Sequence, residues 1–227
     1  MARPQGVLYV DKYFFDIYSD LLGTVLRFPF APQVVRDYDI VDKDGFLSQL
    51  RFFIQQNKIQ PLALTIILSA QVLFAKQIAL ADPTKREAAG LSFVESVPFE
   101  FVGSVSIPSQ NGVEILASNK DMYQTLKQGF ATDGFSTDGV FPAILLRDIH
   151  VTNGLTADIA RRILSMSVSL RAYNFLALPQ TVSPEVKTEE GSIQSQSKKS
   201  NRLYVMIGVF VLLILVLAVF IFLTNRG

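Results

Sequence analysis

The sequence predicts an α+β protein whose folded part consists of two small α/β subdomains, followed by a polar tether and one C-terminal transmembrane helix. Three observations support this prediction. Apolar runs typical of strands alternate with helical apolar patterns over residues 1–173, which is long enough for a domain with its own core. Residues 180–202 are polar and contain no aromatic residue, and residues 203–224 contain no charge.

The first subdomain covers about residues 1–68. It begins with two segments rich in aromatic and β-branched residues, 6–20 and 21–30, which predict a meander of strands. A helix is expected over 42–58, because apolar residues recur there on one helical face: Phe46, Leu47, Leu50, Phe53 and Ile54. The nearly continuous apolar run 62–69 is typical of a strand that is buried on both faces.

The second subdomain, about residues 69–150, is expected to combine strands with two helices. The first helix covers 84–97, with Thr84 and Glu87 as a capping box. The second helix covers 119–134, and one of its faces carries Met122, Leu126 and Phe130. Strands are expected over 71–80, 99–107, 112–118 and 139–147.

A closing helix is predicted over 155–173, with Thr156 as its cap. Its apolar positions lie at helical spacing: Ile159, Ile163, Met166 and Leu170. A short apolar run, "NFLALP" from Asn174 to Pro179, follows directly and precedes the polar residues 180–202. That polar stretch has too few apolar groups to offset the entropy of ordering, so we expect a tether there.

Leu203–Thr224 is an uncharged segment of 22 residues. As a helix it would be about 33 Å long, which is enough to cross a hydrocarbon core of roughly 30 Å. A buried core helix would carry polar residues at helical spacing, which this segment lacks. Lys198, Lys199 and Arg202 precede it and only Arg226 follows it, so the positive-inside rule places the N-terminal domain in the cytoplasm and the C-terminus outside. The expected localisation is the plasma (inner) membrane, with a single pass.

The charge balance argues against a nucleic-acid binder. The chain carries 21 Lys and Arg against 20 Asp and Glu, whereas binding to a phosphate backbone needs a strong basic excess. The chain contains no cysteine. It therefore has no thiol nucleophile and no thiolate metal site, and this composition agrees with a reducing compartment.

The remaining residues offer little chemistry. The only histidine, His150, has one carboxylate nearby in the sequence, Asp148, and a lone histidine at a strand end is usually a surface or turn residue. An acidic run superficially resembles a calcium loop, but it lacks the central glycine and the final glutamate; its members are Asp37, Asp39, Asp42 and Asp44. A helix cap at Asp42 or Asp44 explains this run better. No glycine-rich phosphate loop occurs, so we predict no catalytic residue, no metal site and no cofactor.

The order of the elements resembles PilM, the actin-like cytoplasmic protein of type IV pilus assembly, which is related to the cytoplasmic part of the type II secretion L protein. The resemblance covers roughly Val7 to Tyr173. It rests on the Pro98–Phe99 pair at the end of a helix, the strand Glu114–Ser118 and the Gly134–Phe135 turn after the next helix. It implies that the folded part is half of an actin-like fold.

Two departures from the PilM pattern argue against nucleotide binding. In that family the first turn resembles Asp-Ile-Gly, where the glycine lets the backbone approach a phosphate. Here Asp11 is followed by Lys12 and Tyr13. Family members also continue into a second actin-like lobe, whereas a tether and the predicted span follow the last helix of this chain. We therefore expect no nucleotide binding.

The run "NFLALP" resembles a motif of PilN, the membrane partner of PilM. PilN carries a cytoplasmic Asn-Leu-Leu-Pro motif ahead of its transmembrane helix, and the family relation implies that this peptide docks in a groove of the first PilM lobe. The matching residues, with one residue added, are Asn174, Phe175, Leu176, Leu178 and Pro179. The groove would belong to the same chain or to a second copy, and we favour the same chain. The alternative is that the run only closes the last helix and packs on the core.

These observations predict a non-enzymatic, membrane-anchored assembly or scaffold component of a type IV pilus or a related secretion machine. Its expected partners are other pilus or secretion inner-membrane components, its own PilM-like groove or a second copy, and membrane lipid through one span. Two alternatives stay open. One is a generic tail-anchored adaptor unrelated to pili, and the other is an actin-like ATPase completed by dimerisation, which would need a phosphate-binding loop.

Overall fold

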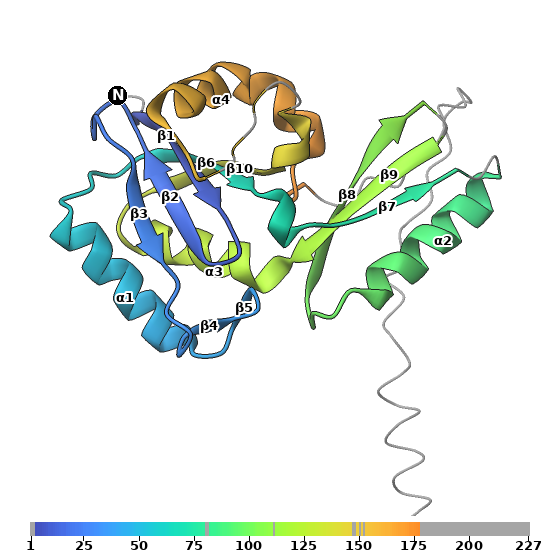
Figure 1. Cartoon of the computed structure of the whole chain (residues 1–227), viewed down its shortest axis with the longest axis horizontal. Helices are drawn as coiled ribbons and strands as arrows, with labels where there is room; N and C mark the ends of the chain where they lie inside the picture. Colours follow the sequence, from blue (N-terminus) through green and yellow to red (C-terminus); the bar gives the residue numbers. More distant parts are fainter. Residues whose placement is uncertain are drawn as a thin grey trace, which may run out of the picture. The chain divides into compact units, whose positions relative to one another are not determined.

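The computed structural model describes residues 3–79, 82–110, 112–146, 149, 151 and 153–177, and it contains a central five-stranded sheet (Figure 1). In spatial order, the strands are β10 (Ser136–Pro142), β6 (Ala63–Leu68), β1 (Gln5–Val10), β2 (Phe14–Tyr18) and β3 (Leu26–Pro29). The β1–β2–β3 part is an antiparallel meander, as the sequence predicts, while β1 and β10 each pair in parallel with β6. The class prediction of mixed α and β elements is confirmed.

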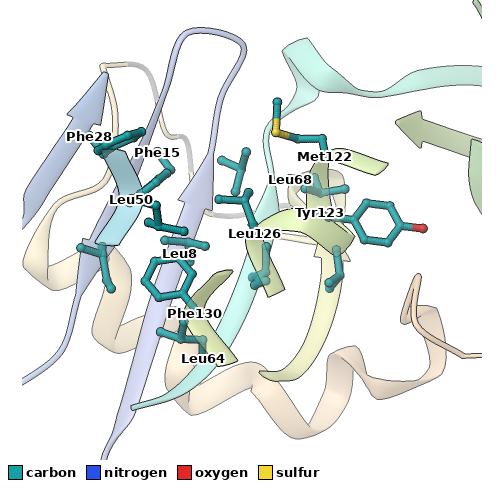
Figure 2. Packing of buried hydrophobic residues seen from close by; sticks show 14 of the residues in the cluster. Leu8, Phe15, Phe28, Leu50, Leu64, Leu68, Met122, Tyr123, Leu126 and Phe130 are labelled. Atoms are coloured by element: carbon teal, nitrogen blue, oxygen red, sulfur yellow. The ribbon is translucent and has the colours of Figure 1, made fainter. Parts of the chain in front are cut away.

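Helices cover both faces of this sheet, and the alternation of side chains along each strand divides the core accordingly. On β1, Leu8 and Val10 belong to a larger cluster, whereas Val7 and Tyr9 belong to a smaller one. The larger cluster includes buried residues of α1 (Lys43–Gln56) and α3 (Lys120–Thr132), and the smaller cluster includes residues of α4 (Ala157–Leu170). Figure 2 shows Leu8, Leu50, Leu126 and Phe130 within the larger cluster. Because both faces are covered, β1 and β6 are buried along nearly their whole length.

A second, three-stranded antiparallel sheet has the order β7-β9-β8, and one helix, α2 (Pro83–Ser96), accompanies it (Figure 1). Its strands are β7 (Phe74–Ile78), β9 (Gly112–Asn119) and β8 (Val102–Ser109). Gly90 lets α2 approach this sheet closely, because a Cβ there would lie 2.6 Å from Ile115 Cδ1.

The structure differs from the sequence-based expectation in several respects. The helix expected over 119–134 in the second subdomain corresponds to α3, which packs in the larger cluster together with α1. The segment of β10 was expected in the second subdomain, but β10 lies in the first sheet beside β6. The expected strand 71–80 begins only at Phe74, because Ser69 caps a short 3₁₀ turn over Ala70–Val72. The predicted capping box of α2 is wrong: the Asp82 carboxylate accepts hydrogen bonds from the backbone N–H of Thr84 (2.9 Å) and Lys85 (3.4 Å).

The caps of the other helices follow the expected chemistry. Asp42 caps α1 by accepting from the Gly45 N–H at 2.9 Å, which confirms the cap interpretation of the acidic run. Thr156 accepts from the Ile159 N–H at 3.3 Å at the start of α4. Asn119 caps α3, and its amide also donates to the Tyr38 carbonyl at 3.0 Å. After α3, Gly134 takes a φ of +87°, which glycine adopts at the end of a helix without strain.

The described residues contain no helix that is both long enough and apolar enough to span a bilayer. The predicted span 203–224 and the predicted tether 180–202 lie outside the described residues, as do Leu178, Pro179 and His150. All described residues belong to one unit, Met1–Thr181, which contains both hydrophobic clusters.

Candidate peptide-docking site

The outer edge of β10 is occupied by the residues that follow the closing helix. β10 is the terminal strand of the five-stranded sheet, so one side of it has no neighbouring strand. At Val140, the backbone N–H and carbonyl on this side form hydrogen bonds with the segment 174–177. The Phe175 N–H donates to the Val140 carbonyl at 2.9 Å, and the Val140 N–H donates to Asn174 Oδ1 at 2.9 Å. The two backbone groups of Val140 on this edge are thus paired by a turn of the same chain.

Asn174 organises the segment as well as binding it. Its Oδ1 atom accepts a second hydrogen bond, from the Leu176 N–H at 3.0 Å, and its carbonyl accepts from the Ala177 N–H at 3.0 Å. The side chain also lies close to the β10 backbone, because a Cβ on Gly139 would be 3.0 Å from Asn174 Nδ2. Asn174 therefore stabilises a turn and also supplies the hydrogen-bond acceptor for the backbone N–H of Val140 on the edge strand.

Phe175 supplies the apolar part of the contact. It is buried with 6% exposure, and its ring centroid lies 5.9 Å from that of Tyr123 on α3. Tyr173 and Leu176 are partly buried against the same larger cluster. Burying a phenylalanine side chain fully contributes about 1.5–3 kcal/mol, so Phe175 is the main apolar anchor of the segment.

Tyr123 extends the site towards the second sheet. Its hydroxyl points away from the labelled leucine and phenylalanine side chains of the larger cluster (Figure 2). That hydroxyl is buried without a hydrogen-bond partner among the described residues, and burial raises the pKa of Tyr123 far above its usual range. Gly103 on β8 makes room for it, because a Cβ there would overlap the hydroxyl. The wall of the site therefore comes from β10, α3 and β8.

The structure brings together three of the five residues that the sequence singled out, Asn174, Phe175 and Leu176; the other two, Leu178 and Pro179, lie outside the described residues. The sequence analysis missed the receiving residues Val140 and Tyr123, which no local pattern distinguishes from ordinary core positions. Gly103 carried a usable signal, because an isolated glycine within a strand indicates close approach of another group.

The turn after β1, where the PilM pattern would hold a phosphate, carries an ion pair of the chain's own side chains. The Lys12 ammonium lies 3.3 Å from Asp37 Oδ1, and this hydrogen bond raises the pKa of Lys12. Asp11 is buried and accepts from the Lys12 N–H at 2.7 Å, while the Tyr13 side chain is exposed. The lysine charge is therefore already balanced by a carboxylate.

A cavity of about 310 Å³ lies beside this turn, and its wall includes Asp11 and Arg27. Arg27 binds Asp16 through Nε (2.8 Å) and Nη2 (2.9 Å) and also donates to the Asn153 carbonyl at 3.0 Å. Since Asp16 balances the guanidinium, Asp11 makes the surroundings of the cavity negative, which disfavours a triphosphate. Among the described residues, no three Asp, Glu or His side chains gather closely enough to hold a metal ion.

No family model matches the chain, and no curated protein sequence matches it. Several solved structures share part of the fold. One is the "PilM-PilN type IV pilus biogenesis complex", with 12% identity, a TM-score of 0.42, and coverage of 60% of this chain and 46% of that chain. Another is the cytoplasmic domain of EpsL, an inner-membrane component of the Vibrio cholerae type II secretion system, with 11% identity, a TM-score of 0.38, and coverage of 65% and 60%.

A third similar structure is a Bacteroides thetaiotaomicron protein of unknown function with an actin-like ATPase fold. It shows 12% identity, a TM-score of 0.35, and coverage of 60% of this chain and 52% of that chain. The chain thus spans about half the length of the structures that it matches. These likenesses are partial, and they establish neither a family nor a function for the chain.

Proposed function

We propose that this chain is a non-enzymatic, membrane-anchored scaffold of a type IV pilus or a related secretion machine, and that it works through protein contacts at the cytoplasmic face of the membrane. The observation that carries the proposal is the segment 174–177 on the edge of β10, where Val140 binds both Asn174 and Phe175. In the sequence this segment stands directly ahead of the polar stretch and the uncharged span.

The contacts support docking of the segment on its own domain. The hydrogen bond from the Phe175 N–H to the Val140 carbonyl would contribute affinity, whereas the bond from the Val140 N–H to the Asn174 side chain and the burial of Phe175 against Tyr123 would contribute specificity. The segment follows the 3₁₀ turn Arg171–Tyr173 without intervening residues, so its effective concentration at its own edge is high.

Partner capture tests the assembly role. The full chain, purified in mild detergent from cells of its own species and examined by mass spectrometry, should retain inner-membrane components of a pilus or secretion machine. The matched control is the same purification of a Phe175→Ala variant, which should retain fewer of them if the docked segment shapes the binding surface. Recovery of no such component with the native chain would contradict the assembly role and would favour the adaptor unrelated to pili.

The membrane topology gives a second test. Because basic residues cluster before the uncharged segment, protease added to intact, wall-stripped cells should leave residues 1–200 uncut. Lysis of the same cells should make the domain accessible and serves as the control. Digestion of the domain without lysis would show that the proposed orientation is wrong.

Nucleotide binding gives a third test. A fragment of residues 1–180 should release no heat of binding when it is titrated with millimolar Mg-ATP, because the Lys12 charge is balanced by Asp37 and the adjacent cavity is negative. A clear isotherm in the micromolar range would revive the ATPase interpretation.

A further inference from the structure

An Asn-Gly dipeptide, Asn153–Gly154, lies in the loop that precedes α4. Asn153 is exposed, and its carboxamide makes no hydrogen bond within the part of the chain that the structure describes. The other three described asparagines all use their side chains in hydrogen bonds: Asn57, Asn119 and Asn174. The Asn153 carboxamide is therefore free to react with a neighbouring group of the chain.

The fold requires the glycine of this dipeptide. Gly154 takes a φ of +103°, which residues with a side chain rarely adopt. A Cβ at this position would also overlap Arg27 Nη2 and would lie 2.5 Å from Asp16 Oδ2. The ion pair of Arg27 with Asp16 therefore leaves room for glycine alone, and the backbone nitrogen of residue 154 has no side chain beside it to shield it from attack on Asn153.

Arg27 binds the peptide group that joins the two residues. Its Nη2 donates to the Asn153 carbonyl oxygen at 3.0 Å, and this carbonyl belongs to the same peptide as the Gly154 N–H. A charged donor at this oxygen stabilises the anion that forms when the N–H loses its proton. The carboxylates of Asp16 and of Asp11, which lines the adjacent cavity, oppose this anion. Among the described residues, however, Arg27 is the group in hydrogen-bond contact with the carbonyl.

We propose that Asn153–Gly154 is a modification site, at which Asn153 converts to isoaspartate without an enzyme and with the assistance of Arg27. The Gly154 nitrogen attacks Cγ of Asn153, the side-chain nitrogen leaves as ammonia with the proton of the Gly154 N–H, and a cyclic imide forms. Water then adds to the former backbone carbonyl carbon of residue 153, and the bond from this carbon to the Gly154 nitrogen breaks. The carboxylate that results contains the oxygen that Arg27 binds, and the main chain continues through Cγ. This chemistry is independent of the proposed assembly role.

The conversion changes the loop in two ways. It lengthens the main chain by one methylene, and it gives Arg27 a second carboxylate partner, which competes with Asp16 for the guanidinium. The longer loop should pull the Leu155 N–H away from Asp16 Oδ2, to which it donates at 2.8 Å in the unmodified chain. Hydrogen exchange of the Leu155 amide should therefore become about tenfold faster, as expected for the loss of a hydrogen bond to a charged group.

Incubation of the full chain in mild detergent at neutral pH tests the proposal, with isoaspartate quantified by peptide mapping and mass spectrometry. Asn153 should convert in the native chain at least as fast as in guanidinium chloride, because the fold supplies both the glycine and the arginine. The hydrogen-bonded Asn119 and Asn174 should stay intact in the native chain. The internal control is Asn111, which also precedes a glycine and should convert like Asn153 once the chain is unfolded.

Two variants complete the test. Asn153→Gln keeps an amide but would need a larger ring, so it should form no isoaspartate and should keep the slow exchange of the Leu155 amide. Arg27→Lys keeps a positive charge for Asp16 but lacks the fork that also reaches the Asn153 carbonyl, so conversion should slow about tenfold.

Three results would overturn the inference. They are slower conversion of Asn153 in the native than in the unfolded chain, aspartate as its main product, and an unchanged rate in Arg27→Lys. Exchange of the Leu155 amide in freshly prepared Arg27→Lys shows whether its loop is still formed. If that variant does not fold, the comparison of the native with the unfolded chain decides by itself.

Discussion

Replacing Phe175 by alanine should lower the free energy of unfolding by about 3 kcal/mol, because buried phenylalanine-to-alanine changes lose both transfer free energy and packing. For a chain of this size, that loss corresponds to a fall in Tm of roughly 6–12 °C. The substitution removes the ring that packs on Tyr123 and leaves in place the hydrogen bond that the Val140 N–H donates to Asn174 Oδ1. Calorimetric and denaturant unfolding of residues 1–180 measures the change.

Phe52→Ala is the matched control for this experiment. Phe52 is 65% exposed, so its removal should change stability by no more than about 0.5 kcal/mol. Combining Phe175→Ala with Leu178→Ala tests the wider motif. Docking within one chain predicts lower stability with no change in oligomeric state, whereas docking between chains predicts that a dimer dissociates. If neither stability nor assembly changes, the motif interpretation fails and the segment is only the beginning of a linker.

Replacing Arg27 by alanine should also cost about 3 kcal/mol, because it leaves the buried carboxylate of Asp16 without its counterion. The Asp16 side chain is 1% exposed, whereas that of Arg27 is 47% exposed. Water can therefore reach part of the vacated space, which places the effect at the lower end of the range for a broken buried pair. The loss should also loosen residues 153–155, since Arg27 binds the Asn153 carbonyl and Asp16 binds the Leu155 N–H at 2.8 Å.

Two variants show whether the ion pair causes this effect. Arg51→Ala removes an exposed arginine from α1 and should change stability by no more than about 0.5 kcal/mol. Adding Asp16→Asn to Arg27→Ala removes the stranded charge and should restore part of the lost stability. Equal unfolding midpoints for Arg27→Ala and Arg51→Ala would show that the pair does not hold this part of the fold.

The helices were predictable because their signals are local. Apolar spacing indicated α1, α3 and α4, and the buried residues Phe46, Leu126 and Ile163 lie on the expected faces. Asp42 was a correct cap choice for the same reason. Asp82 was missed because Thr84 and Glu87 imitate a capping box, while Pro83 at the first helical position favours a start two residues earlier than that box implies.

The pairing partners of the strands were harder to predict from the sequence, because pairing joins residues that are far apart in the chain. The run around Val140 identified a strand, but nothing in it indicated that it would return to β6 of the first sheet. The parallel order β1–β6–β10 requires crossovers whose partners are selected by the burial of both sheet faces. The expected subdomain boundary near residue 69 therefore divides the strands of the two sheets correctly from β6 to β9. β10 follows this boundary in the sequence but belongs to the first sheet.

In the candidate site, too, the sequence indicated the local features, whereas the contacts between distant residues were decided by the fold. The apolar run 174–179 and its resemblance to the PilN motif indicated an apolar anchor at Phe175 and a hydrogen-bonding residue at Asn174. The uncharged run 203–224 led to the membrane prediction, which stays to be tested. The receiving surface was decided by tertiary structure, because Val140 is 34 residues from Asn174 and Tyr123, which packs against Phe175, lies on α3. Periodicity records which side of an element is buried, whereas only the folded chain determines which edge is left open and which segment reaches it.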